Sequence, residues 1–245
     1  MNTSITRFIA FAAGFTGLSA VSSAQTAAQA AAHWEGTVHM EKLELGVVVD
    51  LAKNPSGAWI GSLSFPGTPT VDAPLSDIAV DDKSVRFTAR VPSIAAFQGS
   101  LSADASSLSG SASNADGETT FQLKRTGEAS VKLPPPSSPL PREFAGSWAG
   151  TIESEGKTKH VGLTLAPTAD GIAAATLIAI DHGNLEIPVT TVTIQDRQLR
   201  FESRAISGTF HGTLGDSGEI AGEWSEGAKR IPLIFKQTPS AAAMP

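Results

Sequence analysis

The sequence predicts an all-β protein made of two tandem, antiparallel, up-and-down barrels of eight strands each. Three observations predict this fold: an internal repeat, strands in which apolar and polar residues alternate, and turn signals at short intervals. The composition agrees, because 23 Gly, 15 Pro and only 17% charged residues among 245 are typical of a turn-rich β-protein. An open β-sandwich is the alternative architecture.

The first segment of the chain has the pattern of a signal peptide. Arg7 precedes an apolar run at residues 8–15, and small residues lead up to Ala24. The run is too short and too interrupted for the ~20 residues that a membrane-spanning helix needs. We therefore expect residues 1–24 to be cleaved near Ala24, leaving a periplasmic or secreted protein with no integral membrane association. Residues 25–32 are expected to be disordered.

Two segments, residues 33–126 and 144–238, repeat one pattern. Matched residues keep their order along both segments, and their spacing changes only from 114 to 112. The clearest matches are Trp34-Glu35-Gly36-Thr37 with Trp148-Ala149-Gly150-Thr151, Phe97-Gln98-Gly99 with Phe210-His211-Gly212, and Gly110 with Gly222. Such order indicates a tandem duplication, and each copy is long enough to fold by itself.

Within each copy the apolar residues recur at every second position, as at Val47, Val49 and Leu51. This period gives each strand one buried and one solvated face. About eight such strands per copy, joined by tight turns, favour closure into a barrel because closure removes the exposed edges. Glycines within the strands would allow close approach of the backbones: Gly36, Gly99, Gly110, Gly150, Gly212 and Gly222.

Residues 127–143 form a linker between the copies. Five of the eight residues at 134–141 are proline, which favours an extended, semi-rigid spacer and argues against a central strand. We expect this linker to lie outside both domains. The final residues, 239–245, are expected to be a disordered tail.

The repeated motifs resemble a small β-domain that bacteria place before secreted α/β-hydrolase or other serine-hydrolase domains. Gly146-Ser147-Trp148 is also similar to the Gly-x-Trp segment of lipocalin-like (calycin-type) barrels. In those barrels the Trp seals the floor beneath a basic residue of the last strand, which implies floor roles for Trp34, Trp148 and Arg125. The sequence departs from that pattern at Ala32, where the first copy lacks the Gly, and at Gln237, which stands in the place of Arg125.

The chain lacks the residues that most chemistry would need. It has no Cys, no Gly-x-Ser-x-Gly nucleophile motif and no closely spaced pair of His, so we expect no enzyme activity, no cofactor and no bound metal. The net charge of -6 argues against binding to nucleic acid.

Recognition is expected at loop ends or on an outer face. The turn at Asp181, His182 and Asn184 is one candidate, and Trp59, which the second copy does not match, is another. Neither barrel is expected to hold a large ligand cavity, because the inward positions carry bulky residues. Those considered are Trp148, Leu163, Leu165, Ile178, Ile194, Leu199, Phe201, Leu233 and Phe235.

Three functions fit these observations. The first is a non-enzymatic, secreted or periplasmic tandem-barrel module that binds an unknown protein or small molecule. The second is an accessory subunit of a separately encoded serine hydrolase, and the third is a lipocalin-like carrier of a small apolar ligand.

Overall fold

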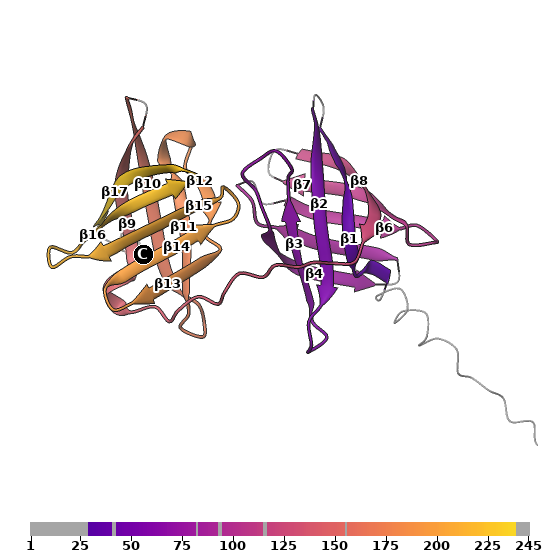
Figure 1. The fold of residues 1–245 in the computed structure, drawn as a ribbon, viewed down its shortest axis with the longest axis horizontal. Coiled ribbons are helices and arrows are strands. Elements are labelled where there is room, and N and C mark those ends of the chain that lie inside the picture. The colour runs from indigo at the N-terminus through magenta and orange to yellow at the C-terminus, as the bar shows by residue number, and fades with distance from the viewer. Residues whose placement is uncertain are drawn as a thin grey trace, which may run out of the picture.

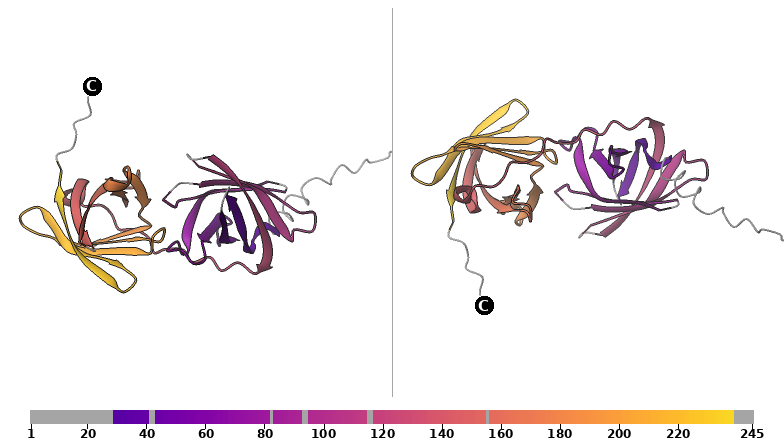
Figure 2. Two further views of the ribbon diagram at one scale, coloured as in Figure 1. Left: turned by 90° about the horizontal axis from the view of Figure 1, so that it is seen from above. Right: turned by 90° about the horizontal axis from the view of Figure 1, so that it is seen from below.

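The fold is all-β and contains two barrel-like units that lie side by side, as seen in the computed structural model (Figure 1). The structure describes residues 29–238 except 41–42, 82, 93–94, 115–116 and 155. Views from above and below show the strands of each unit curving around that unit's own interior (Figure 2). The expected signal peptide and the tail at 239–245 lie outside the described residues. The prediction of disorder at 25–32 is wrong for its described part, because Ala30 and Ala32 are fully buried and Ala32 begins the first strand.

The first unit is a closed barrel of eight antiparallel strands, each paired with its neighbours in the chain, and β1 pairs with β8. This arrangement is the predicted up-and-down barrel. Its strands are β1 (Ala32–Met40), β2 (Leu43–Lys53), β3 (Trp59–Ser64), β4 (Ala73–Asp81), β5 (Ser84–Ala89), β6 (Ala95–Leu101), β7 (Ser107–Asn114) and β8 (Gly117–Gly127).

The second unit has nine strands in place of the expected eight. Its sheet runs β12-β11-β10-β9-β17-β16-β15-β14-β13, so β12 and β13 are its two edges. Together these two strands correspond to β4 of the first barrel, and the chain leaves the sheet between them at Val189 and Thr190. The strands are β9 (Gly146–Ser154), β10 (Lys157–Pro167), β11 (Ala173–Ala179), β12 (Leu185–Pro188), β13 (Thr191–Gln195), β14 (Gln198–Ser203), β15 (Gly208–Leu214), β16 (Glu219–Glu226) and β17 (Lys229–Gln237). Two single turns of 3-10 helix, η1 (Arg142–Phe144) and η2 (Ile180–His182), complete it.

Each barrel has its own apolar core, as the alternation predicts. Corresponding phenylalanines stack in both cores: the ring centroids of Phe87 and Phe97 are 4.8 Å apart, and those of Phe201 and Phe210 are 5.1 Å apart. Matched strand faces thus build matched cores, which supports the duplication inferred from the sequence.

The strands approach closely at several of the glycines, as expected. Gly110 lies opposite Gly99, and Gly222 lies opposite Gly212, in corresponding strand pairs. A Cβ added to Gly110 would lie 2.0 Å from the carbonyl oxygen of Gln98, so no larger residue fits there without moving the strands.

The proline-rich linker is built into the second barrel. The backbone N–H of Ser138 donates to the carbonyl oxygen of Val192 (2.8 Å). The hydroxyl oxygens of Ser137 and Ser138 accept from the backbone N–H groups of Val192 (3.0 Å) and Ile194 (3.1 Å). The linker therefore pairs with the edge of β13 that β14 leaves free.

The same segment also contacts the turn before β11. The Ser138 carbonyl accepts from the N–H of Ala173 (2.8 Å), and the Leu140 N–H donates to the carbonyl of Gly171 (3.0 Å). Residues 137–140 thus bridge β13 and β11 and cover the seam of the second barrel. At these residues the structure differs from the expected free spacer, because serine hydroxyl and N–H groups supply the hydrogen bonds that proline cannot make.

The beginning of the linker is held by the first barrel. The buried carboxylate of Asp50 accepts from the backbone N–H of Ser130 (2.7 Å) and lies 2.8 Å from Nδ1 of His33. The hydrogen bond to Asp50 raises the pKa of His33. Both ends of the linker are therefore attached to barrels.

Direct contacts between the barrels add to the linker. The loop between β3 and β4 lies against the loop between β14 and β15: the Thr70 hydroxyl donates to the Ala205 carbonyl (2.7 Å), and the Val71 N–H donates to the Arg204 carbonyl (3.1 Å). The Arg204 guanidinium in turn donates to the Asp72 carbonyl (3.2 Å). Independent folding of each copy remains a prediction.

Substituting Ser138→Pro is expected to destabilise the second barrel by about 2 kcal/mol, because two backbone groups of β13 lose their partners. Urea unfolding measures this change, and hydrogen exchange should be faster at the Ile194 N–H, which loses its acceptor. Leu133→Pro is the control, since Leu133 lies in the same linker with an exposed side chain. Equal stability of the two variants would show that the seam contributes nothing.

Candidate functional site

A hollow of about 810 Å³, here called the mouth pocket, opens at one end of the first barrel. Its walls come from the end of β1, the start of β2, strands β6 to β8 and two loops. Apolar side chains dominate the walls: Val38, Leu45, Phe65, Val91, Phe97 and Ala112. The volume lies within the range of roughly 300 to 1,000 Å³ that small-molecule sites occupy. The expectation that neither barrel holds a large cavity is therefore wrong for the first barrel.

Among the described residues, a pocket of this kind occurs in the first barrel and not in the second. One pair of corresponding residues explains this difference. Ala112 and Trp224 correspond, because each lies opposite the Phe of the matched Phe-x-Gly segments. Trp224 is buried, and its ring lies so close over Gly208 that a Cβ there would be 2.1 Å from it. In the first barrel Ala95 holds the place of Gly208, each being the first residue of its strand. The Trp224 indole thus fills the space that Ala112 leaves open.

The opposite end of each barrel is closed by a tryptophan. The Trp34 side chain is fully buried, and its Nε1–H donates to the Ala30 carbonyl (3.1 Å). Trp148 is 2% exposed and donates in the same way to the Phe144 carbonyl (3.0 Å). Trp34 stands at the start of β1 and the mouth pocket at its end, so Trp34 closes the barrel at the end away from the pocket. Arg125 lies opposite Trp34 in β8, with its side chain exposed.

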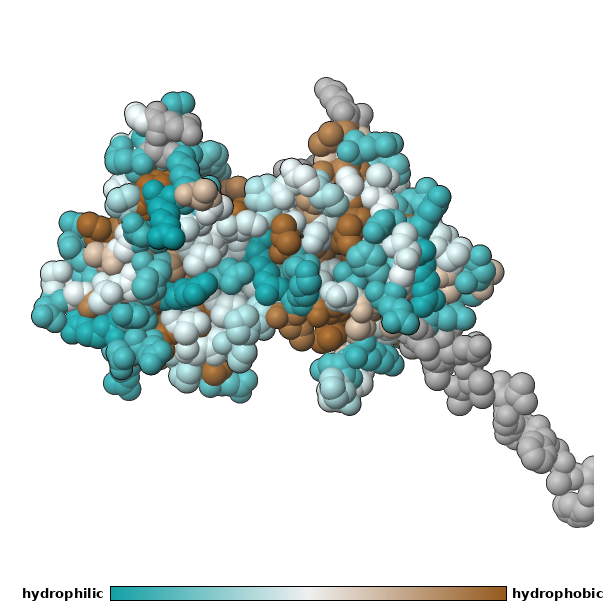
Figure 3. Space-filling view, viewed as in Figure 1, coloured by the Kyte–Doolittle hydropathy of each residue, from teal (hydrophilic) through white to brown (hydrophobic). Residues whose placement is uncertain are grey.

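The rim of the mouth pocket combines apolar and polar groups. Met40 and Leu43, on either side of the β1–β2 tip, are 47% and 58% exposed. Brown, apolar atoms are visible just below this tip in the space-filling view (Figure 3). On the same strands His39 Nδ1 lies 3.1 Å from a carboxylate oxygen of Glu44. A ligand with an apolar body and a polar end would match such a rim.

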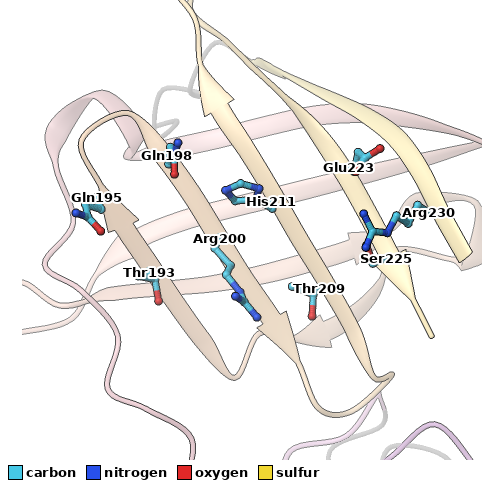
Figure 4. Close-up of a pocket in the computed structure, with 9 residues that line it drawn as sticks. All are labelled: Thr193, Gln195, Gln198, Arg200, Thr209, His211, Glu223, Ser225 and Arg230. Carbon is cyan, nitrogen blue, oxygen red and sulfur yellow. The ribbon is translucent and has the colours of Figure 1, made fainter. Parts of the chain in front are cut away.

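A second hollow, of about 360 Å³, lies on the outer face of the second barrel and is here called the outer hollow (Figure 4). Thr193, Arg200, His211 and Glu223 lie opposite one another on four adjacent strands, and Arg230 lines the hollow from β17. Strand alternation turns these side chains outward while their neighbours fill the core. The side chains of Arg200, His211 and Arg230 make no hydrogen bond or ion pair with any described residue.

The predicted recognition turn lies on the surface between β11 and β12. The Asp181 carboxylate accepts from the His160 backbone N–H (2.6 Å) and lies 3.1 Å from His160 Nδ1; these contacts, the backbone bond first, lower the pKa of Asp181. Gly183 and Asn184 have positive φ angles of 71° and 60°, which Gly and Asn tolerate well. His182 is exposed. Neither pocket described above includes this turn.

Trp59 begins β3 and is half-buried against the core of the first barrel. The Lys53 ammonium lies 5.3 Å from the ring centroid, which is a cation–π distance. Trp59 corresponds to Ala173, which the linker contacts in the second barrel. The first barrel thus has the Trp59 indole at a position where the second barrel has the small side chain of Ala173 and a contact with the linker.

Sequence reasoning missed both hollows. A comparison of the inward positions of the two copies could have indicated the mouth pocket, because the small Ala112 of the first copy corresponds to the large Trp224 of the second. The outer hollow depends on which strand neighbours which, and its residues are spread from Thr193 to Arg230.

Comparison with known proteins identifies no relatives by sequence, since neither a protein family nor a curated protein matches the chain. Seven chains of solved structures are similar to it, including the following two crystal structures. One is a protein of Bacteroides fragilis provisionally named an outer membrane protein (14% identity, TM-score 0.31, 87% of this chain and 99% of that one). The other is a protein of unknown function from the DUF3598 family of Nostoc punctiforme (10% identity, TM-score 0.24, 87% and 98%). At these TM-scores neither similarity carries an argument about function.

No three His, Asp or Glu side chains among the described residues gather into a possible metal site. No helix in the described part of the chain is long and apolar enough to span a membrane. The fold and its hollows define a tandem β-barrel protein whose first barrel opens into an apolar pocket.

Proposed function

We propose that the protein is a non-enzymatic binding module whose first barrel holds one small apolar molecule. The observation that carries this proposal is the mouth pocket itself, open in the first barrel and filled by Trp224 in the second. Of the three functions expected from the sequence, this is the lipocalin-like carrier.

The pocket walls set the chemistry of the ligand. Moving apolar surface from water into contact with Phe65, Val91 and Phe97 is favourable by about 25 cal/mol per Å². Thr119 and Thr120 at the start of β8, together with His39, offer polar contacts near the opening. The ligand is therefore a small molecule with an apolar body and one polar end that stays close to solvent.

The pattern at residues 1–24 supports a periplasmic or secreted location for this binding. A carrier of sparingly soluble molecules has an evident use in such a compartment. The core of the second barrel is filled, so this barrel would bind a different ligand or partner from the first.

The proposal predicts that the uncharged dye N-phenyl-1-naphthylamine binds the full chain saturably, with one site. The double variant Ala95→Gly/Ala112→Trp copies the second barrel's arrangement and fills the pocket, so it is expected to weaken binding about tenfold or more. Dye fluorescence gives the affinity, and circular dichroism checks the fold.

Ser111→Trp is the matched control. Ser111 is the neighbour of Ala112 in β7 and lines hollows of the outer face, so the same indole is added on the other side of the sheet. This variant should bind the dye like the wild-type protein. Failure of the wild-type protein to bind, or equal binding by the pocket-filled variant, would contradict the proposal.

A further inference from the structure

Corresponding hollows on the outer faces of the two barrels differ in the balance of their charged residues. The outer hollow of the second barrel is lined by Arg200 and Arg230 with one carboxylate, Glu223. The corresponding hollow of the first barrel is lined by one arginine, Arg86, with two carboxylates, Asp77 and Glu118. Within a chain of net charge -6, the second barrel thus carries a local excess of positive charge.

The two guanidinium groups are available to a ligand. Neither Arg200 nor Arg230 pairs with a carboxylate among the described residues, although Glu223 lines the same hollow. Glu202, which also lies on β14, is instead 3.5 Å from Arg204. Unpaired cations that share a concave surface raise the local concentration of anions.

Strand register fixes how these groups face each other. Arg200 lies opposite His211, and Thr209 lies opposite Ser225, which in turn lies opposite Arg230. The close-up shows the Thr209 side chain on the face between the two arginines, with the His211 ring nearby (Figure 4). The hollow therefore presents two guanidinium groups together with hydroxyl donors.

We propose that the outer hollow binds an oxyanion, the carboxylate, sulfate or phosphate group of a small polar molecule, between Arg200 and Arg230. Guanidinium groups bind oxyanions through paired, charge-assisted hydrogen bonds. The hydroxyls of Thr209 and Ser225 add neutral donors. No Phe or Trp side chain lines the hollow, so recognition depends mainly on charge and hydrogen bonds.

Titration of the full chain with inorganic sulfate, inorganic phosphate and acetate, followed by the amide NMR signals of Thr209 and Ser225, tests this site. The three probes separate tetrahedral anions from carboxylates. Arg200→Gln and Arg230→Gln are each expected to weaken binding of the preferred probe about tenfold, because each removes charge-assisted hydrogen bonds. Glu223→Gln is expected to strengthen it, since the repelling carboxylate is removed.

Arg86→Gln is the matched control, because Arg86 corresponds to Arg200 on the carboxylate-rich face of the first barrel. It should leave the affinity unchanged. The proposal is overturned if no probe binds, if Arg86→Gln weakens binding as much as Arg200→Gln, or if Glu223→Gln leaves the affinity unchanged. These results are independent of dye binding in the mouth pocket.

Discussion

Trp148→Ala is expected to lower the free energy of unfolding of the second barrel by about 3 to 5 kcal/mol, the usual cost of truncating a large buried aromatic residue. The side chain is 2% exposed and closes one end of the barrel. Its loss leaves a cavity and also leaves the Phe144 carbonyl, which accepts from the indole, without that partner. Denaturant unfolding of the full chain measures the change.

Trp59→Ala is the comparison for this result. It removes the same indole from a half-buried site that already contacts solvent, so its cost should be clearly smaller. Equal costs for the two substitutions would show that Trp148 does not act as a core residue.

The main architecture could be predicted because duplication and strand period are both local signals in the sequence. Apolar residues at every second position identify the buried faces, and the matched Trp34 and Trp148 mark the first strand of each copy. The closed eight-stranded barrel of the first copy confirms this interpretation.

The seam of the second barrel could not be predicted in the same way. A run rich in proline is correctly read as unable to form a central strand, but one N–H and two hydroxyls at Ser137 and Ser138 are enough to pair with β13. Whether such a segment docks depends on whether a strand edge is free beside it. The edge of β13 is free because the chain leaves the sheet between β12 and β13. This break is a feature of the tertiary structure and has no local signal in the sequence.

Neither hollow could be predicted from the alternation of apolar and polar residues alone. The bulky residues that argued against a cavity all belong to the second copy, whereas the first copy carries Ala112 where the second has Trp224. One of them, Ile178, was wrongly expected to face inward: it lies opposite Gly162 on the outer face of β11, and its neighbour Leu177 is the residue that faces the core. Pocket volume depends on such single exchanges and not on the period. In the outer hollow, alternation shows that Arg200 and Arg230 face outward, but only the order of the strands brings them to one surface.

Gly222→Ala is expected to cost about 3 kcal/mol or more, at or above the upper end of ordinary overpacking effects, because the added methyl group meets backbone and not a movable side chain. A Cβ at this position would lie 2.2 Å from the His211 carbonyl oxygen and 2.5 Å from the Gly212 Cα. Strands β15 and β16 must therefore separate, which breaks the pairing that also carries the outer hollow.

The control is Gly215→Ala in the adjoining turn, where the nearest atoms are 3.6 Å away and φ is not in the left-handed region. Thermal unfolding should show a large loss for Gly222→Ala and almost none for Gly215→Ala. A small loss at Gly222 would mean that the two strands lie farther apart than their pairing requires.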